Sequence, residues 1–122
     1  MRSAILVAAL LGLLLTIAGA VGAHVQDESL RDASRRWDGA LLFGFVHVLA
    51  ASIAAVAPLG RLRLAAAWAF IVGVSLFCGI QIATLIWGPG SAFQAVSVLI
   101  PVGGLAFMVG WLALAVAALR AD

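Results

Sequence analysis

Charged side chains are scarce in this chain of 122 residues: 10% of the positions are charged, while 66% are hydrophobic. The mean hydropathy of +1.23 is far above that of a water-soluble domain, so a soluble globular protein is excluded. Intrinsic disorder is excluded as well, because it requires low hydrophobicity and high charge. The composition therefore indicates a small membrane protein.

Lysine and tyrosine are absent, and cysteine occurs once, at Cys78. One thiol can build neither a disulfide framework nor a cysteine-based metal site. The seven basic residues are all arginines, and they form no basic block that could neutralise a nucleic-acid backbone. We therefore expect no nucleic-acid partner.

The few charged residues divide the chain into long uncharged runs. They occur at Arg2, between Asp27 and Asp38, at Arg61 and Arg63, and at the C-terminal end. Since an ionised side chain at the bilayer centre costs about 2.5 to 3.5 kcal/mol, uncharged runs mark membrane spans. The run after Arg63 is long enough for two spans.

A dense turn signal, Trp87-Gly-Pro-Gly-Ser91, cuts this last run. The sequence thus predicts one all-α domain over residues 1–122, an integral membrane protein with four antiparallel transmembrane helices in an up-down bundle. The expected spans are 4–23, 38–57, 64–86 and 94–118, with a charged loop at 25–37. Apolar residues at helical spacing in this loop predict an amphipathic helix that leads into the second span.

The arginines also predict the orientation in the bilayer. With both termini in the cytoplasm, Arg2, Arg61, Arg63 and Arg120 lie inside, against three arginines of the charged loop outside. We therefore expect both termini to be cytoplasmic. The N-terminal segment also imitates a secretory signal peptide, whose cleavage after Ala20 would leave three helices, and we favour the uncleaved first helix.

Several motifs point to a known family. They are Gly19-Ala-Val-Gly22-Ala-His24, Phe-Val-His47-Val-Leu-Ala, Leu-Phe-Cys-Gly79, and Pro101-Val-Gly103-Gly104 with Gly110-Trp111. In this order they resemble the YgdD-like family of small four-helix membrane proteins of unknown function. The chain departs from that pattern before His47, where Phe43-Gly-Phe-Val46 replaces polar or tyrosine residues. The resemblance implies a four-helix fold and a bacterial inner-membrane or mitochondrial setting, of which we favour the former, but no known reaction.

His47 is the most informative polar residue. It follows Trp37 by ten positions, which places it about 15 Å into the bilayer. One interpretation makes it a ligand for haem or a metal, or a hydrogen-bond donor to a quinone. The interpretation that we favour makes it a neutral histidine bonded to a neighbouring helix, with Gln81 as the expected partner. No bound cofactor is therefore expected.

Other motif residues favour packing over chemistry. His24 at the end of the first helix has a favourable interaction with the helix dipole. Pro101 is expected to interrupt the fourth helix and to release the carbonyl of Ser97, while Gly103 and Gly104 permit close helix approach. Transporters use such breaks for ions, but a packing role is the commoner one. Small residues recur four apart at Ala8/Gly12/Thr16, Gly19/Ala23, Ser75/Gly79/Ala83 and Ala106/Gly110, as at helix interfaces in lipid.

Apart from Asp38 at the first position of the second span, no Asp, Glu, Lys or Arg lies within an expected span, and no nucleophile has a base at a recognisable spacing. Proton-coupled transport and enzymatic activity are therefore disfavoured. We expect a non-catalytic accessory or scaffold unit that contacts the lipid bilayer and either a larger membrane complex or further copies of itself. The alternatives are a redox or cofactor-binding protein centred on His47, and a small channel or carrier.

Overall fold

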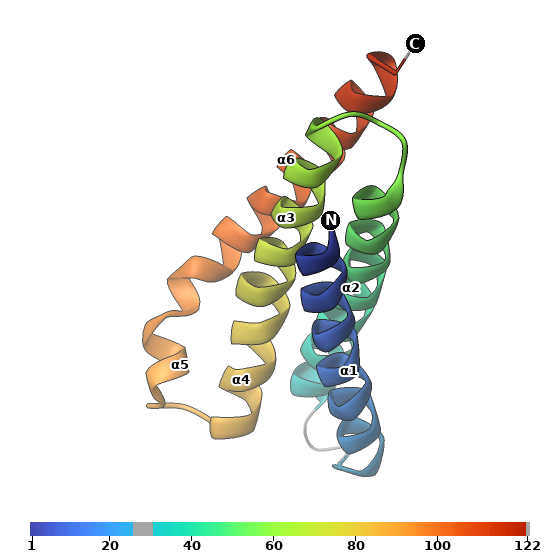
Figure 1. Ribbon diagram of the computed structural model, residues 1–122. Helices are drawn as coiled ribbons and strands as arrows, with labels where there is room; N and C mark the ends of the chain where they lie inside the picture. The colour runs from blue at the N-terminus through green and yellow to red at the C-terminus, as the bar shows by residue number, and fades with distance from the viewer. Residues whose placement is uncertain (26–30, 122) are drawn as a thin grey trace.

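The computed structural model describes residues 1–25 and 31–121, and every regular element in them is a helix (Figure 1). The elements are α1 (Arg2–Val25), α2 (Arg31–Val56), α3 (Leu62–Gly73), the π-helix η2 (Val74–Gly79), α4 (Ile80–Trp87), α5 (Ala92–Ala95), the 3-10 helix η3 (Ser97–Leu99) and α6 (Ile100–Leu119).

Four helical segments are long and apolar enough to cross a membrane, namely Arg2–Ala23, Asp32–Val56, Leu62–Trp87 and Ser97–Leu119. The predicted all-α class and the number of such helices are confirmed. The third segment is continuous through α3, η2 and α4, with a six-residue π-helix inside it. The second segment begins inside the expected loop, because α2 already starts at Arg31 and its first turns contain charged residues from Arg31 to Asp38.

Helices α1 and α2 pack through small residues. Residues later in α1 contact residues earlier in α2. A Cβ atom added to Gly12 would lie 3.4 Å from Val48, and one added to Gly19 would lie 3.7 Å from Leu41. Farther along, the indole of Trp37 occupies the space where a side chain at Gly22 would stand. Small residues let the two backbones approach closely, which is how helices gain contact in lipid.

The second tight pair is α3 with α6, and it is built from phenylalanines facing glycines. Phe70 on α3 covers Gly110, where an added Cβ would lie 2.6 Å from its ring. In return, the Phe107 ring of α6 covers Gly73 of α3. Each large ring thus fills the gap left by a missing side chain on the opposite helix. Residues later in α3 thus contact residues earlier in α6.

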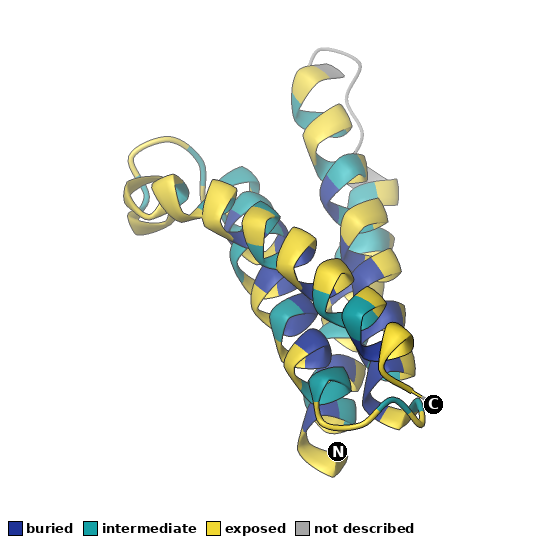
Figure 2. Cartoon of the chain, turned by 90° about the horizontal axis from the view of Figure 1, so that it is seen from above, coloured by how far each residue is buried: buried dark blue, intermediate teal, exposed yellow. Residues whose placement is uncertain are grey.

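Helix α1 packs on α2 and α3, whereas α6 packs on α3 and η2. Within the described residues, α1 and α6 make no extensive contact with each other, so the four long helices do not close into a ring. Figure 2 shows the buried residues between the helices and the exposed ones on their outer faces. Those outer faces are apolar: Leu6, Leu10 and Leu13 on α1 and Leu105, Met108 and Leu112 on α6 are all more than half exposed.

Pro101 does not break a long helix, as the sequence had suggested, but stands in the first turn of α6. There its missing N–H is one that an α-helix leaves unbonded in any case. The Ser97 carbonyl is not released either, because it accepts the N–H of Ile100. The interruption lies upstream, where α4 ends at Trp87 and the turn places Gly88 and Gly90 at φ of 76° and 82°.

Candidate functional site

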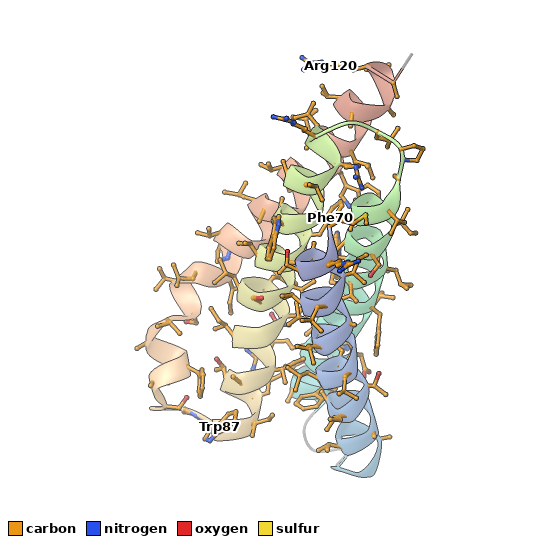
Figure 3. All side chains as sticks on the ribbon, in the orientation of Figure 1. Phe70, Trp87 and Arg120 are labelled. Carbon is orange, nitrogen blue, oxygen red and sulfur yellow. The ribbon has the colours of Figure 1, made fainter. Side chains whose placement is uncertain are left out.

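His47 lies on α2 and is 5% exposed. Among the described residues it is the one buried side chain that is polar or charged. Aromatic rings from three helices surround it: Phe43 from α2, Phe70 from α3, and Phe107 and Trp111 from α6. Phe70, labelled in Figure 3, lies between the end of the molecule that carries Arg120 and the end that carries Trp87. The site is therefore enclosed at mid-height.

Both ring nitrogens of His47 are hydrogen-bonded. Nδ1 lies 2.7 Å from the carbonyl oxygen of Phe43, one turn earlier on α2. The indole nitrogen of Trp111 lies 3.2 Å from Nε2. A carbonyl can only accept and an indole N–H can only donate, so Nδ1 carries the proton and Nε2 accepts. These two partners assign the neutral tautomer of the imidazole.

The imidazole is also stacked against Phe107. Their ring centroids are 3.7 Å apart and their planes differ by 17°. Trp111 meets His47 edge-on at 6.0 Å and Phe70 edge-on at 5.0 Å. Edge-on and offset arrangements are the favourable ones for aromatic pairs. The cluster thus joins α2, α3 and α6 through ring contacts in addition to the hydrogen bond.

This arrangement limits what His47 can do chemically. A neutral histidine binds a metal or haem iron through an unprotonated ring nitrogen. Here that nitrogen already accepts the indole hydrogen of Trp111, so ligation would require Trp111 to withdraw and leave its N–H without a partner. In the described part of the chain, no group of three or more His, Cys, Asp or Glu side chains could hold a metal ion.

The predicted partner of His47 was wrong. The Gln81 amide donates instead to the backbone carbonyl of Arg36, at 2.8 Å. It therefore ties α4 to the N-terminal part of α2, at a different level from the imidazole. The residue of a neighbouring helix that bonds to His47 is Trp111, whose indole N–H donates to Nε2. The sequence interpretation had grouped Trp111 only with the packing residues. His24 lies in the last turn of α1, but its side chain is outside the part of the chain that the structure describes.

The motif glycines differ in what surrounds them. A Cβ atom on Gly103 would overlap the backbone and side chain of Phe77, whereas one on Gly104 would lie 3.8 Å from the Phe77 ring, an ordinary contact. Gly79 has only the Val74 carbonyl within 4 Å, at 3.8 Å, and is exposed. Close packing therefore requires Gly103 and Gly110, but neither Gly104 nor Gly79.

The phenylalanines of this cluster were missed by the sequence interpretation, although a signal for them exists. Residues 70–77 read Phe-x-x-Gly-x-x-x-Phe, and residues 103–110 read Gly-x-x-x-Phe-x-x-Gly. The second pattern complements the first when it is read in reverse. Two helices that run in opposite directions can then place each ring on a glycine, as Phe70 and Phe107 do.

A groove of about 270 Å³ lies between α1 and the η2–α4 segment. One wall carries the small residues Ser75, Gly79 and Ala83, and the other carries leucines of α1. The Ser75 hydroxyl donates to the Ile71 carbonyl at 2.9 Å, so it presents no free donor to the groove. The complete lining is Leu11, Leu14, Leu15, Val74, Ser75, Gly79, Ile82, Ala83, Ile86 and Trp87. This surface suits apolar contact.

A family model described as "Protein of unknown function (DUF423)" matches residues 18–104. The chain belongs to this family. No curated protein and no solved structure matches the chain. The matched region includes His47, Phe70 and Gly103, whereas Phe107 and Trp111 follow its last residue.

Proposed function

We propose that this DUF423 protein is an integral membrane protein with a structural role, a non-catalytic accessory or scaffold unit that associates with other membrane helices. The observation that carries the proposal is the state of His47. In the described residues, His47 is the one buried polar side chain, and both of its ring nitrogens are hydrogen-bonded, one within α2 and the other to Trp111 of α6. A side chain used in this way contributes to the stability and shape of the fold.

The proposal includes insertion of the four long helices as an antiparallel up-down arrangement in a bacterial inner membrane, with both termini cytoplasmic. The apolar outer faces of α1 and α6 support insertion, because a bilayer solvates such faces and water does not. The arginine bias supports the orientation. The motif resemblance supports placement among YgdD-like proteins within the wider family of unknown function.

Accessibility labelling tests the insertion and the orientation. Cys78 is replaced by Ala, and single cysteines are introduced as Ser34→Cys, Leu59→Cys, Pro89→Cys and Ala121→Cys. An impermeant maleimide applied to intact cells should label positions 34 and 89, whereas positions 59 and 121 should require permeabilised cells. Labelling of 59 or 121 in intact cells would contradict the orientation, and extraction of the protein by alkaline carbonate would contradict insertion.

The groove provides the surface that we propose for contact with a transmembrane helix of a partner. Gly79 and Ala83 are four positions apart, and in the described part of the chain no other helix covers Gly79. Small residues at this spacing let another helix approach closely. A Leu side chain at Gly79 should therefore reduce co-purification of the partner in mild detergent. Gly39→Leu is the matched control, because an added Cβ at Gly39, like one at Gly79, would meet no other helix within 4 Å, but Gly39 lies outside the groove.

Purified protein also distinguishes this role from the cofactor alternative. The structural role predicts no haem absorption, no stoichiometric metal and no extractable quinone, and it predicts an assembly larger than the monomer. A bound pigment or metal lost in His47→Leu would contradict the proposal and support cofactor binding. A colourless and isolated monomer in mild detergent would contradict association.

A further inference from the structure

The helix contacts place four of the seven arginines at one end of the molecule. Phe70 of α3 contacts Gly110 of α6, and residues earlier in α3 lie level with residues later in α6. Arg61, nine residues before Phe70, is therefore level with Leu119, nine residues after Gly110 and next to Arg120. Figure 1 shows the α2–α3 connection and the end of α6 together at this end. Arg63 belongs to the same first turn of α3.

Arg2 reaches the same end through the α1–α2 pair. Gly12 of α1 contacts Val48 of α2, and residues earlier in α1 lie level with residues later in the chain beyond Val48. Arg2, ten residues before Gly12, is therefore level with Pro58, ten residues after Val48 in the α2–α3 connection. We call the end that carries Arg2, Arg61, Arg63 and Arg120 the arginine end.

The two ends of the molecule differ in charge. The acids in the described residues, Asp32 and Asp38, lie near the start of α2, where Arg35 and Arg36 balance them. Outside the described residues, the sequence adds Asp27 and Glu28 before α2 and Asp122 after Arg120. Among the described residues, the arginine end thus has four basic residues and no acid, whereas the opposite end has three basic residues and two acids.

The four arginines do not have the same surroundings. Arg63 is partly buried, and its guanidinium donates to the backbone carbonyl of Ala55 in the last turn of α2. It therefore satisfies a carbonyl that the helix end leaves unbonded. Arg2, Arg61 and Arg120 are exposed. Trp68, two turns after Arg61 and 41% exposed, is of the type that anchors a helix at the headgroup level.

We propose that the arginine end binds the phosphates of anionic phospholipid headgroups, chiefly through Arg61 and Arg120. A guanidinium presents a fork of N–H donors that matches phosphate oxygens, and it remains charged at every physiological pH. Arginines at a membrane end attract anionic lipids electrostatically. The inference rests on the proposed membrane insertion, because only an inserted chain holds this end at headgroup level.

The test compares lipids on the full-length protein in neutral detergent. Native mass spectrometry measures the affinity for phosphatidylglycerol and for phosphatidylcholine with the same acyl chains. Two variants carry the same change in charge: Arg61→Gln/Arg120→Gln at the arginine end and Arg35→Gln/Arg36→Gln at the opposite end. Inorganic phosphate, added at the same concentration, distinguishes a lipid site from a site for free phosphate. Circular dichroism checks that each variant retains its helices.

We expect the wild type to prefer phosphatidylglycerol. Each arginine should contribute about fivefold, so Arg61→Gln/Arg120→Gln should lower that affinity roughly 25-fold without changing the affinity for phosphatidylcholine. Arg35→Gln/Arg36→Gln should change it less than twofold. Equal affinities for the two lipids, equal losses in the two double variants, or displacement of the lipid by inorganic phosphate would each overturn the proposal. If any of these three results were found while cysteine labelling gave the expected pattern, the lipid-binding proposal would fail and the proposed membrane insertion would stand.

Discussion

The indole of Trp111 on α6 donates a hydrogen bond to Nε2 of His47 on α2, and this bond joins two residues that are 64 positions apart in the chain. Together with the Phe43 carbonyl on Nδ1, it occupies both nitrogens of the imidazole. The same residue that suggests cofactor chemistry in the sequence thus acts as a connector in the fold. Its polar atoms are satisfied inside an aromatic cluster, as buried polar groups must be.

The His47–Trp111 bond should appear as a coupling energy in a double-mutant cycle. His47→Leu and Trp111→Phe each remove one partner, and we expect a coupling of about 0.6 to 1.7 kcal/mol, the range of interhelical hydrogen bonds in membrane proteins. The measurement is the free energy of unfolding in mixed micelles. The control cycle pairs His47→Leu with Gln81→Leu, which should be additive within about 0.5 kcal/mol. Coupling with Gln81 and none with Trp111 would contradict the assigned bond.

Adjacent glycines on α6 should respond differently to a methyl group. Gly103→Ala places its Cβ against Phe77 and should cost about 1 to 3 kcal/mol, as overpacking does. Gly104→Ala meets only an ordinary contact at 3.8 Å and should be neutral, or stabilising by up to about 1 kcal/mol through helix propensity. Thermal unfolding in detergent measures both variants. Equal losses would mean that η2 and α6 do not pack as described.

Pro101→Ala should have little effect, because Pro101 stands in the first turn of α6 and removes no hydrogen bond from the helix interior. We expect a change within about 0.5 kcal/mol in the free energy of unfolding and an unchanged helix content. Circular dichroism and thermal unfolding provide the measurement. A clear gain in helix content would indicate instead that the proline breaks a longer helix, as the sequence alone suggested.

Arg63→Gln should destabilise the protein, whereas Arg61→Gln should not. Arg63 supplies a charged donor to the Ala55 carbonyl, and Arg61 is exposed. Because Arg63 is only partly buried, we expect a loss of about 1 to 2 kcal/mol, toward the lower end for a bond to a charged group. The change at Arg61 should stay within about 0.5 kcal/mol. The free energy of unfolding, measured without added lipid, is the comparison, and equal values for the two variants would remove the capping role.

The four long apolar helices could be predicted from the sequence because the free-energy cost of placing a charged side chain in lipid applies to each residue separately. A charged side chain is costly in the bilayer core, so Arg61 and Arg63 indicate where the third apolar helix begins. The expected start at residue 64 and the observed start of α3 at Leu62 differ by two residues. The turn at Gly88 and Gly90 could also be predicted residue by residue, because both residues adopt the positive φ that glycine favours.

The partner of His47 could not be predicted in the same way. Depth in the bilayer follows from counting residues, but the direction of a side chain around the helix axis depends on unbroken helical phase. The π-helix η2 precedes Gln81 and adds residues to its turns, so the side chains that follow it are rotated about the axis relative to an uninterrupted helix. The Gln81 amide meets the backbone carbonyl of Arg36, eleven positions before His47 on α2, so counting from Trp87 did not bring it to the level of the imidazole.

The Phe–Gly patterns of α3 and α6 show what was still available in the sequence. Of these two glycines the sequence analysis singled out Gly110 alone, whereas Gly73 and Gly110 each contact a phenylalanine ring of the other helix. Taking the two segments together, in opposite directions, would have identified the pair. The tryptophan four positions after Phe107 then falls on the same side of α6, within reach of His47.

The protonation state of His47 tests the central claim most directly, namely that this residue connects helices and does not serve as a ligand. Nitrogen-15 NMR of histidine-labelled protein in detergent distinguishes a protonated, an unprotonated and a metal-bound ring nitrogen, and His24→Asn removes the other histidine signal. We expect a proton on Nδ1 and an unprotonated Nε2, with the Nε2 resonance shifting in Trp111→Phe. A proton on Nε2, a metal-shifted resonance, or an Nε2 signal indifferent to Trp111→Phe would contradict the account.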